Sequence, residues 1–260
     1  MKILFLGNNR LGWKVADWLR KQNEDIVALV VHPKTKRKFG NEIIRSSKVK
    51  RSHIFDGSAL QKEKVINSIK KLKPDIAVSV CFGFILEKKF LQSFPGSCIN
   101  LHTAFLPYNR GSCPNVWSIV DNTPAGATIH YMDEGIDSGA IIARKQIAVS
   151  SADTGASLYQ KLEDAAFRLF KNTWPSIRSG RSRKKSQKKS KGTNHRLKDL
   201  SGIDKIDLNR KYQAKQLINI VRARTFPPYA GAYYVENGKK IYLRLQLLDE
   251  KDLKKENGLH

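Results

Sequence analysis

The chain has 260 residues, of which 40% are hydrophobic and 27% charged, a composition that supports a buried core and excludes wholesale disorder. This length gives one ordinary domain plus a smaller remainder and excludes two full-sized domains. Lysine and arginine number 48 against 23 acidic residues, and the resulting net charge of +25 means that a polyanionic partner must be considered.

Cysteine spacing and apolar runs indicate the compartment. Cys81, Cys98 and Cys113 suit neither a disulfide framework nor a zinc site, so no metal is expected. The first apolar run stops at Gly7, too early for a signal peptide, and the run over 76–86 is too short to cross a bilayer. We therefore expect a cytoplasmic protein with no membrane partner.

The first hundred residues alternate between strand and helix patterns. Nearly continuous apolar runs predict four strands, over 2–6, 26–31, 75–80 and 97–102. Helical spacing predicts three helices, over 11–21, 60–72 and 87–91. Strands that are apolar on both faces are typical of a parallel sheet covered by helices on each side. The prediction is a doubly wound, mostly parallel, Rossmann-like α/β sheet.

The rest of the chain divides at a basic stretch. A loop over 103–113, a helix over 114–120, strands over 126–132 and 140–149 and a helix from 153 complete a main domain, 1–177. Residues 178–198 contain ten basic residues, no acidic one and no apolar periodicity, so 178–202 is predicted to be a solvated loop or linker. A helix over 212–222 and an Asn-Gly hairpin then predict a small appendage, 203–260.

One strand carries residues that suit acyl transfer. Asn100 and His102 are two positions apart, so both side chains point to one face of the sheet, at the carboxyl end where such folds place ligands. Asn100 offers an amide donor for an oxyanion, His102 a proton carrier, and Asp137 a group to orient the ring. Spacing alone leaves the alternative open that His102 and Asp137 are structural, and His130 is predicted to be structural.

Several motifs together resemble the folate-dependent formyltransferases. This family includes glycinamide ribonucleotide formyltransferase, methionyl-tRNA formyltransferase and the sugar-nucleotide N-formyltransferases. The motifs are Asn100-Leu101-His102, Leu106-Pro107-Tyr108-Asn109-Arg110-Gly111, Pro114-Asn115-x-Trp117-Ser118, Gly126-Ala127-Thr128-Ile129-His130 and the 133–139 segment. The Asn-Arg-Gly loop, and the 222–229 segment that leads into the hairpin, are closest to the sugar-nucleotide branch, whose hairpin helps to form a dimer. The resemblance covers about 1–177 and 203–247.

The resemblance implies a reaction and a set of site residues. The reaction is transfer of a formyl group from 10-formyltetrahydrofolate to the primary amine of a nucleotide-linked amino deoxysugar, in a homodimer. It implies that Asn100, His102 and Asp137 are catalytic. It places the folate against Phe82, Gly83, Ile85, Leu86, Met132, Asp133 and Glu134. The expected substrate contacts are Tyr108, Asn109, Arg110, Trp117, Phe226 and Tyr229.

Alternatives remain for the partners and for some of these residues. Phe82 and Phe84 suit a plain core equally well, and Phe226 and Tyr229 either stack on a base or pack the hairpin. The charge keeps a methionyl-tRNA formyltransferase-like enzyme open, although only 58 residues follow Gly202, fewer than the C-terminal barrel of that enzyme needs. A third possibility is a catalytically inactive basic nucleic-acid-binding module.

Overall fold

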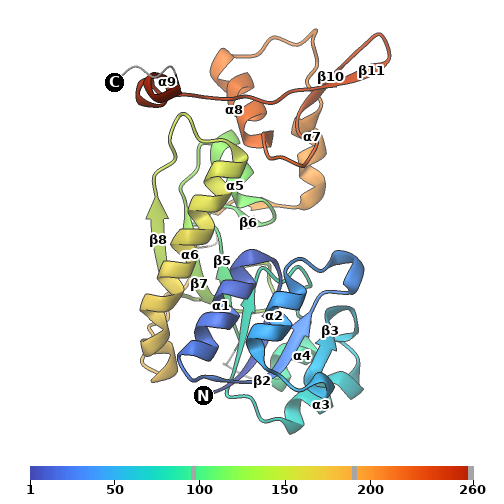
Figure 1. The fold of residues 1–260 in the computed structure, drawn as a ribbon, viewed down its shortest axis with the longest axis vertical. Helices are drawn as coiled ribbons and strands as arrows, with labels where there is room; N and C mark the ends of the chain where they lie inside the picture. Colours follow the sequence, from blue (N-terminus) through green and yellow to red (C-terminus); the bar gives the residue numbers. More distant parts are fainter. Residues whose placement is uncertain (95–97, 189–191, 257–260) are drawn as a thin grey trace.

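A seven-stranded sheet forms the centre of the molecule (Figure 1). The computed structural model describes residues 1–94, 98–188 and 192–256. The strands, in spatial order, are β3 (Ile54–Asp56), β2 (Asp25–Val31), β1 (Lys2–Gly7), β4 (Ile76–Val80), β5 (Cys98–His102), β7 (Ala125–Tyr131) and β8 (Ile141–Ile147). The first five strands of this order, from β3 to β5, are mutually parallel. β7 runs antiparallel to β5, and β8 runs antiparallel to β7. The predicted doubly wound, mostly parallel sheet is confirmed.

Helices cover both faces of this sheet. On one face α1 (Asn9–Lys21), α2 (Gly40–Ser47) and α6 (Gly155–Arg178) pack against one set of alternate strand residues, such as Phe5. On the other face α3 (Glu63–Lys71) and α4 (Lys88–Ser93) pack against the next set, such as Leu4. This alternation follows from the two-residue period of a strand. The short elements α2 and β3 were not predicted.

A buried carboxylate fastens the end of α6 to the sheet. Glu24 is 1% exposed, and its Oε1 accepts hydrogen bonds from Trp174 Nε1 and Arg178 Nε, each at 2.9 Å. We expect Glu24→Ala to lower the free energy of unfolding by about 1–3 kcal/mol, because it leaves the buried Trp174 N–H without its acceptor. Urea denaturation measures the loss. Glu63→Ala is the control, since Glu63 pairs with Lys89 on the surface, where such a pair contributes less than about 1 kcal/mol.

The C-terminal appendage lies at one end of the long axis, beside α5 (Pro114–Val120) (Figure 1). It contains α7 (Ser201–Asp204), α8 (Ala214–Arg224), the hairpin strands β10 (Tyr233–Glu236) and β11 (Lys239–Tyr242), and α9 (Glu250–Glu256). Ala223 of α8 packs with Val116 and Leu158 of the main domain, and buried Arg222 donates to the Asp153 carbonyl at 2.8 Å. The predicted helix and Asn-Gly hairpin are present, and they are attached firmly to the main domain.

The basic stretch after α6 is bound to the main domain rather than free in solvent. Its short strand β9 (Asn194–His195) pairs with β6 (Arg110–Gly111), and the backbone of Lys185 exchanges two hydrogen bonds with that of Ile141. We call residues 182–188 and 192–195 the strap. The prediction of a solvated loop is right for most of these side chains, which are exposed, but the segment is not a free linker because its backbone is attached to the main domain. Lys189 and Lys191 of the predicted basic run lie outside the described residues.

The described helices and side-chain clusters bear on two further sequence expectations. Throughout 1–94, 98–188 and 192–256, no helix combines the length and apolar character needed to span a bilayer. In the same ranges, no three His, Cys, Asp or Glu side chains gather in a way that suits a metal ion.

Candidate active site

The polar residues of β5 share one face of the sheet, as its alternation requires. Ile99 and Leu101 are buried in the core under α1 and α6, whereas Asn100 and His102 are partly exposed on the opposite face. β5 lies between β4 and the antiparallel β7, and its register sets Asn100 directly opposite His130 of β7. This placement brings an amide and two imidazoles to one edge of the sheet.

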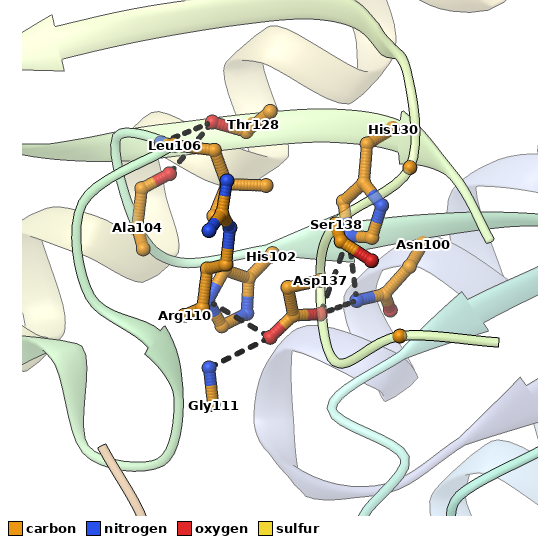
Figure 2. A network of polar contacts seen from close by, with 12 residues as sticks. Asn100, His102, Ala104, Leu106, Arg110, Gly111, Thr128, His130, Asp137 and Ser138 are labelled. Atoms are coloured by element: carbon orange, nitrogen blue, oxygen red, sulfur yellow. Dashed lines mark hydrogen bonds and ion pairs between the residues drawn. The ribbon is translucent and has the colours of Figure 1, made fainter. Parts of the chain in front are cut away.

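Asp137 reaches these groups from the turn between β7 and β8 (Figure 2). Its Oδ1 accepts a hydrogen bond from Asn100 Nδ2 at 3.3 Å, and its Oδ2 lies 3.5 Å from His102 Nε2. The backbone N–H of Gly111 donates to Oδ2 at 2.9 Å. The three predicted catalytic residues therefore form one connected group.

The environment of Asp137 favours its charged form. Burial by itself raises the pKa of a carboxyl, but the charge of His102, the contacts with His130 and the Gly111 N–H together hold the pKa of Asp137 well below its usual range. Its backbone adopts a left-handed φ of +50°, which Asp tolerates better than most residues. The site thus holds a permanent negative charge beside two imidazoles.

His130 belongs to this group, although the sequence predicted only a structural role. Its Nδ1–H donates to the Tyr131 carbonyl at 2.8 Å, and its Nε2 lies 3.3 Å from both Asn100 Nδ2 and Asp137 Oδ1. A neutral ring accepts from Asn100, whereas a protonated ring donates to Asp137. The antiparallel pairing of β5 with β7 was the missing information, because it sets His130 across from Asn100.

Hydrogen bonds to neighbouring elements hold the loop after β5 in place. Thr128 Oγ1 donates to the Ala104 carbonyl at 2.7 Å and accepts from the Leu106 N–H at 3.1 Å (Figure 2). The Asn109 side chain is fully buried and donates to Ser118 and Thr123. The backbone carbonyl of Asn109 lies 3.3 Å from His102 Nε2. The expected substrate contact through the Asn109 side chain is therefore corrected to a role in shaping the loop.

Two further predicted substrate residues are covered by the strap. Arg110 is only 6% exposed, and its Nε and Nη2 donate to Gln187 Oε1 at 3.1 and 2.8 Å. Trp117 is buried, with the His195 ring stacked on it at a centroid distance of 4.1 Å. These contacts occupy the groups that were expected to meet the substrate, so the geometry does not support direct contact by Arg110 or Trp117.

The remaining predicted substrate residues are accessible. Tyr108 is partly exposed in the loop after β5. Phe226 packs between Tyr159 and Tyr229, with centroid distances of 5.3 Å to each. Tyr229 is exposed, and its hydroxyl accepts a hydrogen bond from Lys38 Nζ at 2.5 Å. An aromatic pair from the appendage therefore meets a lysine from the loop that follows β2.

The predicted folate segments lie side by side. An ion pair between Lys88 and Glu134, at 3.3 Å, joins the segment after β4 to the turn after β7. Asp133, like Glu134, is exposed, and Met132 is partly buried against the core that contains Leu86. The two segments present the exposed apolar side chains of Ile85 and Ile136.

An aromatic cluster supports the first of these segments. Phe82 and Phe84 contact the His32 ring at centroid distances of 5.3 and 4.9 Å, and His32 Nε2 accepts a hydrogen bond from the exposed Gly83 N–H at 3.1 Å. Burial lowers the pKa of His32, and Lys36 adds to this shift. Both phenylalanines are partly buried, so they support the wall of the site.

Family profiles match both parts of the chain. The profile described as Formyl transferase matches residues 1–173, and the profile described as N-formyltransferase dimerization C-terminal domain matches 199–249. A dTDP-4-amino-4,6-dideoxyglucose formyltransferase from Mycobacterium bovis is 33% identical over 177 residues, which are 65% of this chain and 75% of the relative. A methionyl-tRNA formyltransferase from Clostridioides difficile is 28% identical over 98% of this chain and 83% of the relative.

Solved structures share the whole architecture. A 4-N formyltransferase from Francisella tularensis superposes with a TM-score of 0.81 at 28% identity, over 95% of this chain and 98% of the other. A formyltransferase from Anoxybacillus kamchatkensis, solved with UDP-4,6-dideoxy-4-formamido-L-AltNAc and tetrahydrofolate, has a TM-score of 0.60 at 29% identity, over 78% and 89% of the two chains.

Proposed function

The chain belongs to the formyl transferase family, and we propose that Asn100, His102 and Asp137 transfer the formyl group of 10-formyltetrahydrofolate to the amine of a nucleotide-linked amino deoxysugar. The observation that carries the proposal is the connected group around Asp137, at the carboxyl end of β5. The substrate class is supported by the relative described as a dTDP-4-amino-4,6-dideoxyglucose formyltransferase and by the structure solved with a UDP-linked 4-formamido sugar.

Each residue has a chemical role in this proposal. The ring of His102 has Nε2 beside the Asn109 carbonyl and Asp137, so the neutral ring carries its hydrogen on Nε2 and presents Nδ1 as a base for the amine proton. The Asp137 carboxylate stabilises the imidazolium that results, and the imidazolium would return this proton to the folate nitrogen as its bond to the formyl carbon breaks and tetrahydrofolate leaves. Asn100 keeps one Nδ2 hydrogen on Asp137 and turns the other, which lies near His130 Nε2 in the structure, to the formyl oxygen, where negative charge develops during attack.

The two predicted folate segments fit a flat, partly apolar ligand. The exposed side chains of Ile85 and Ile136 offer apolar contacts, and the exposed Gly83 leaves room for close approach of its backbone. We assign the folate to the surface formed by Gly83, Ile85, Asp133 and Glu134, which Phe82, Leu86 and Met132 support from the core side. When bound, 10-formyltetrahydrofolate supplies the formyl group.

The nucleotide is assigned to the accessible aromatic residues. Phe226 and Tyr229 offer faces for base stacking, which contributes about 1–3 kcal/mol per base in other proteins. Lys38, which the sequence analysis did not single out, adds a positive charge beside Tyr229 that suits a phosphate. A cytoplasmic location, where folate donors and nucleotide sugars are at hand, is part of the proposal.

The proposal is tested by offering the purified enzyme a choice of acceptors. The panel contains 10-formyltetrahydrofolate with dTDP-, UDP- and GDP-linked 3-amino and 4-amino deoxysugars, and charged initiator tRNA. We expect one sugar nucleotide to gain the mass of one formyl group. Formylation of the tRNA alone would instead favour the methionyl-tRNA formyltransferase-like alternative. RNA binding without turnover of any acceptor would indicate an inactive nucleic-acid-binding module.

The match to a dimerization domain indicates a dimer-forming module, and we propose that the hairpin supplies the contact. Tyr234 faces the appendage core, so Tyr233, Val235 and Tyr242 share the other face, where Val235 and Tyr242 are 41% and 50% exposed. We expect Val235→Asp to shift the mass measured by light scattering from dimer to monomer. Leu197→Asp, at an exposed position outside the hairpin, is the control and should leave a dimer.

A further inference from the structure

One side chain of the strap joins both backbone segments that contact the catalytic group. Gln187 Nε2 donates to the carbonyls of Asp137 and Gly139 at 2.8 and 2.7 Å, and its Oε1 accepts from Arg110. We propose that Gln187 is a positioning residue for formyl transfer. It fixes the position of the turn that carries Asp137 relative to the loop that carries Arg110 and Gly111. The inference rests on the catalytic roles proposed above.

The turn that carries Asp137 needs such support. Asp137 has a left-handed φ of +50°, a conformation that costs free energy for a residue with a side chain. Gln187 binds the carbonyls on both sides of Ser138, so one rigid amide plane fixes two points of this turn. A rotation of either peptide would break one of these hydrogen bonds and redirect the carboxylate.

The other end of the Gln187 side chain acts on the loop after β5. Arg110 is buried, and its guanidinium forms a fork with Gln187 Oε1. The adjacent Gly111 N–H donates to Asp137 Oδ2, and the Asn109 carbonyl lies beside His102 Nε2. Gln187 therefore connects the partners of Asp137 and of His102 through a single side chain.

The chemistry of this position requires an amide. Both hydrogens of Nε2 are used on carbonyl oxygens, and Oε1 uses its lone pairs on two N–H groups of Arg110, so every polar atom of Gln187 is satisfied. Glutamate keeps the length and the pairing with Arg110, but it has no hydrogen for the two carbonyls. The Gln187→Glu variant therefore keeps the pairing with Arg110, removes both donors to the Asp137 turn and adds a negative charge facing its carbonyls.

The first test measures steady-state kinetics of the full chain with the acceptor that the panel identifies. We expect Gln187→Ala and Gln187→Glu to lower kcat by about 10- to 100-fold, because small displacements of reacting groups have effects of this size. KM for both substrates should change by less than about threefold, since every polar atom of Gln187 is already bonded within the protein. Ser186→Ala, at an exposed neighbouring position, is the control and should match the unmodified enzyme.

The second test separates positioning from a structural role. In an Asp137→Asn background, Gln187→Ala should lower the residual single-turnover rate by less than about threefold, because the group that it positions is already lost. Losses that multiply, or an unchanged kcat for both Gln187 variants, would overturn the inference. If the alanine variant does not fold, the isosteric glutamate variant decides. An unmodified enzyme that formylates no acceptor would instead contradict the proposed function.

Discussion

The His102→Ala enzyme is expected to transfer formyl groups about 10²- to 10⁴-fold more slowly than the unmodified enzyme, the range that a positioned acid–base group contributes. The amine must lose a proton as it attacks. Of the two imidazoles beside the charge of Asp137, His102 is the more exposed. Asn100→Ala should lower kcat by about 10²- to 10³-fold, the effect of removing one oxyanion donor. Mass spectrometry of the acceptor, after reaction with 10-formyltetrahydrofolate that carries an isotope label in its formyl group, measures both rates.

Folding controls make this result interpretable. Asn100 and His102 are partly exposed and lie outside the buried core, so both variants should keep the circular dichroism spectrum and melting temperature of the unmodified chain. His53→Ala, in the 3₁₀ turn before β3, removes an imidazole far from β5 in the sheet order and should retain full activity. Activity within a few-fold of the unmodified enzyme for His102→Ala or Asn100→Ala would refute the assigned roles.

Replacing Asp137 by Asn is the second change with a large expected effect. The amide keeps the size of the side chain, but it removes the charge that stabilises protonated His102 and can turn an N–H toward the ring. We expect kcat to fall by about 10²- to 10⁴-fold, while both substrates still bind, because Asp137 acts through the imidazole. Isothermal titration with the nucleotide sugar checks the binding, and a loss of binding with normal kcat would contradict this role.

The same substitution has a pH-dependent effect on stability. The folded-state pKa of Asp137 is depressed, because His102, His130 and the Gly111 N–H outweigh the opposing effect of burial. A depressed carboxyl pKa adds stability above the unfolded-state value of about 3.9, and this contribution is lost as the pH falls below it. Urea denaturation should therefore show Asp137→Asn less stable than the unmodified chain at pH 7, with a gap that narrows toward pH 3. A gap that widens on acidification would show that the charge is not favoured in the folded state.

The centre of the sheet was predictable because strands such as β1, β2 and β4 are buried on both faces. Runs such as 2–6 and 26–31 appear as continuous apolar patterns, and β1 and β2 occupy them. β3 has only three residues, which are partly exposed, so no periodic pattern marks it. The strap was missed for a related reason: it is attached by backbone and amide hydrogen bonds, which leave no apolar spacing in the sequence.

Some features of the site could be predicted from the sequence, whereas others depend on contacts that the sequence does not reveal. Strand alternation correctly indicated that Asn100 and His102 share a face. Their approach to Asp137 depends on the turn after β7. Residue chemistry offered Asp137 as a partner of His102 but left a structural role open, and the family resemblance favoured the catalytic role. The burial of Arg110 and Asn109 could not be derived, because sequence patterns do not reveal side-chain hydrogen bonds such as those of Arg110 with Gln187 and of Asn109 with Ser118.

The path of the strap has a consequence for the engineering of chimeric enzymes. The two family profiles end at residue 173 and begin again at 199, so a module exchange designed on those limits treats everything between them as replaceable spacer. In this protein that interval contains Gln187, Thr193 and His195, which form part of the wall around Asp137 and Arg110. A chimera that combines this sheet with the C-terminal module of another protein must therefore keep this interval of the chain. Without it, Asn100, His102 and Asp137 would be present but the loops around them would lose the contacts of Gln187.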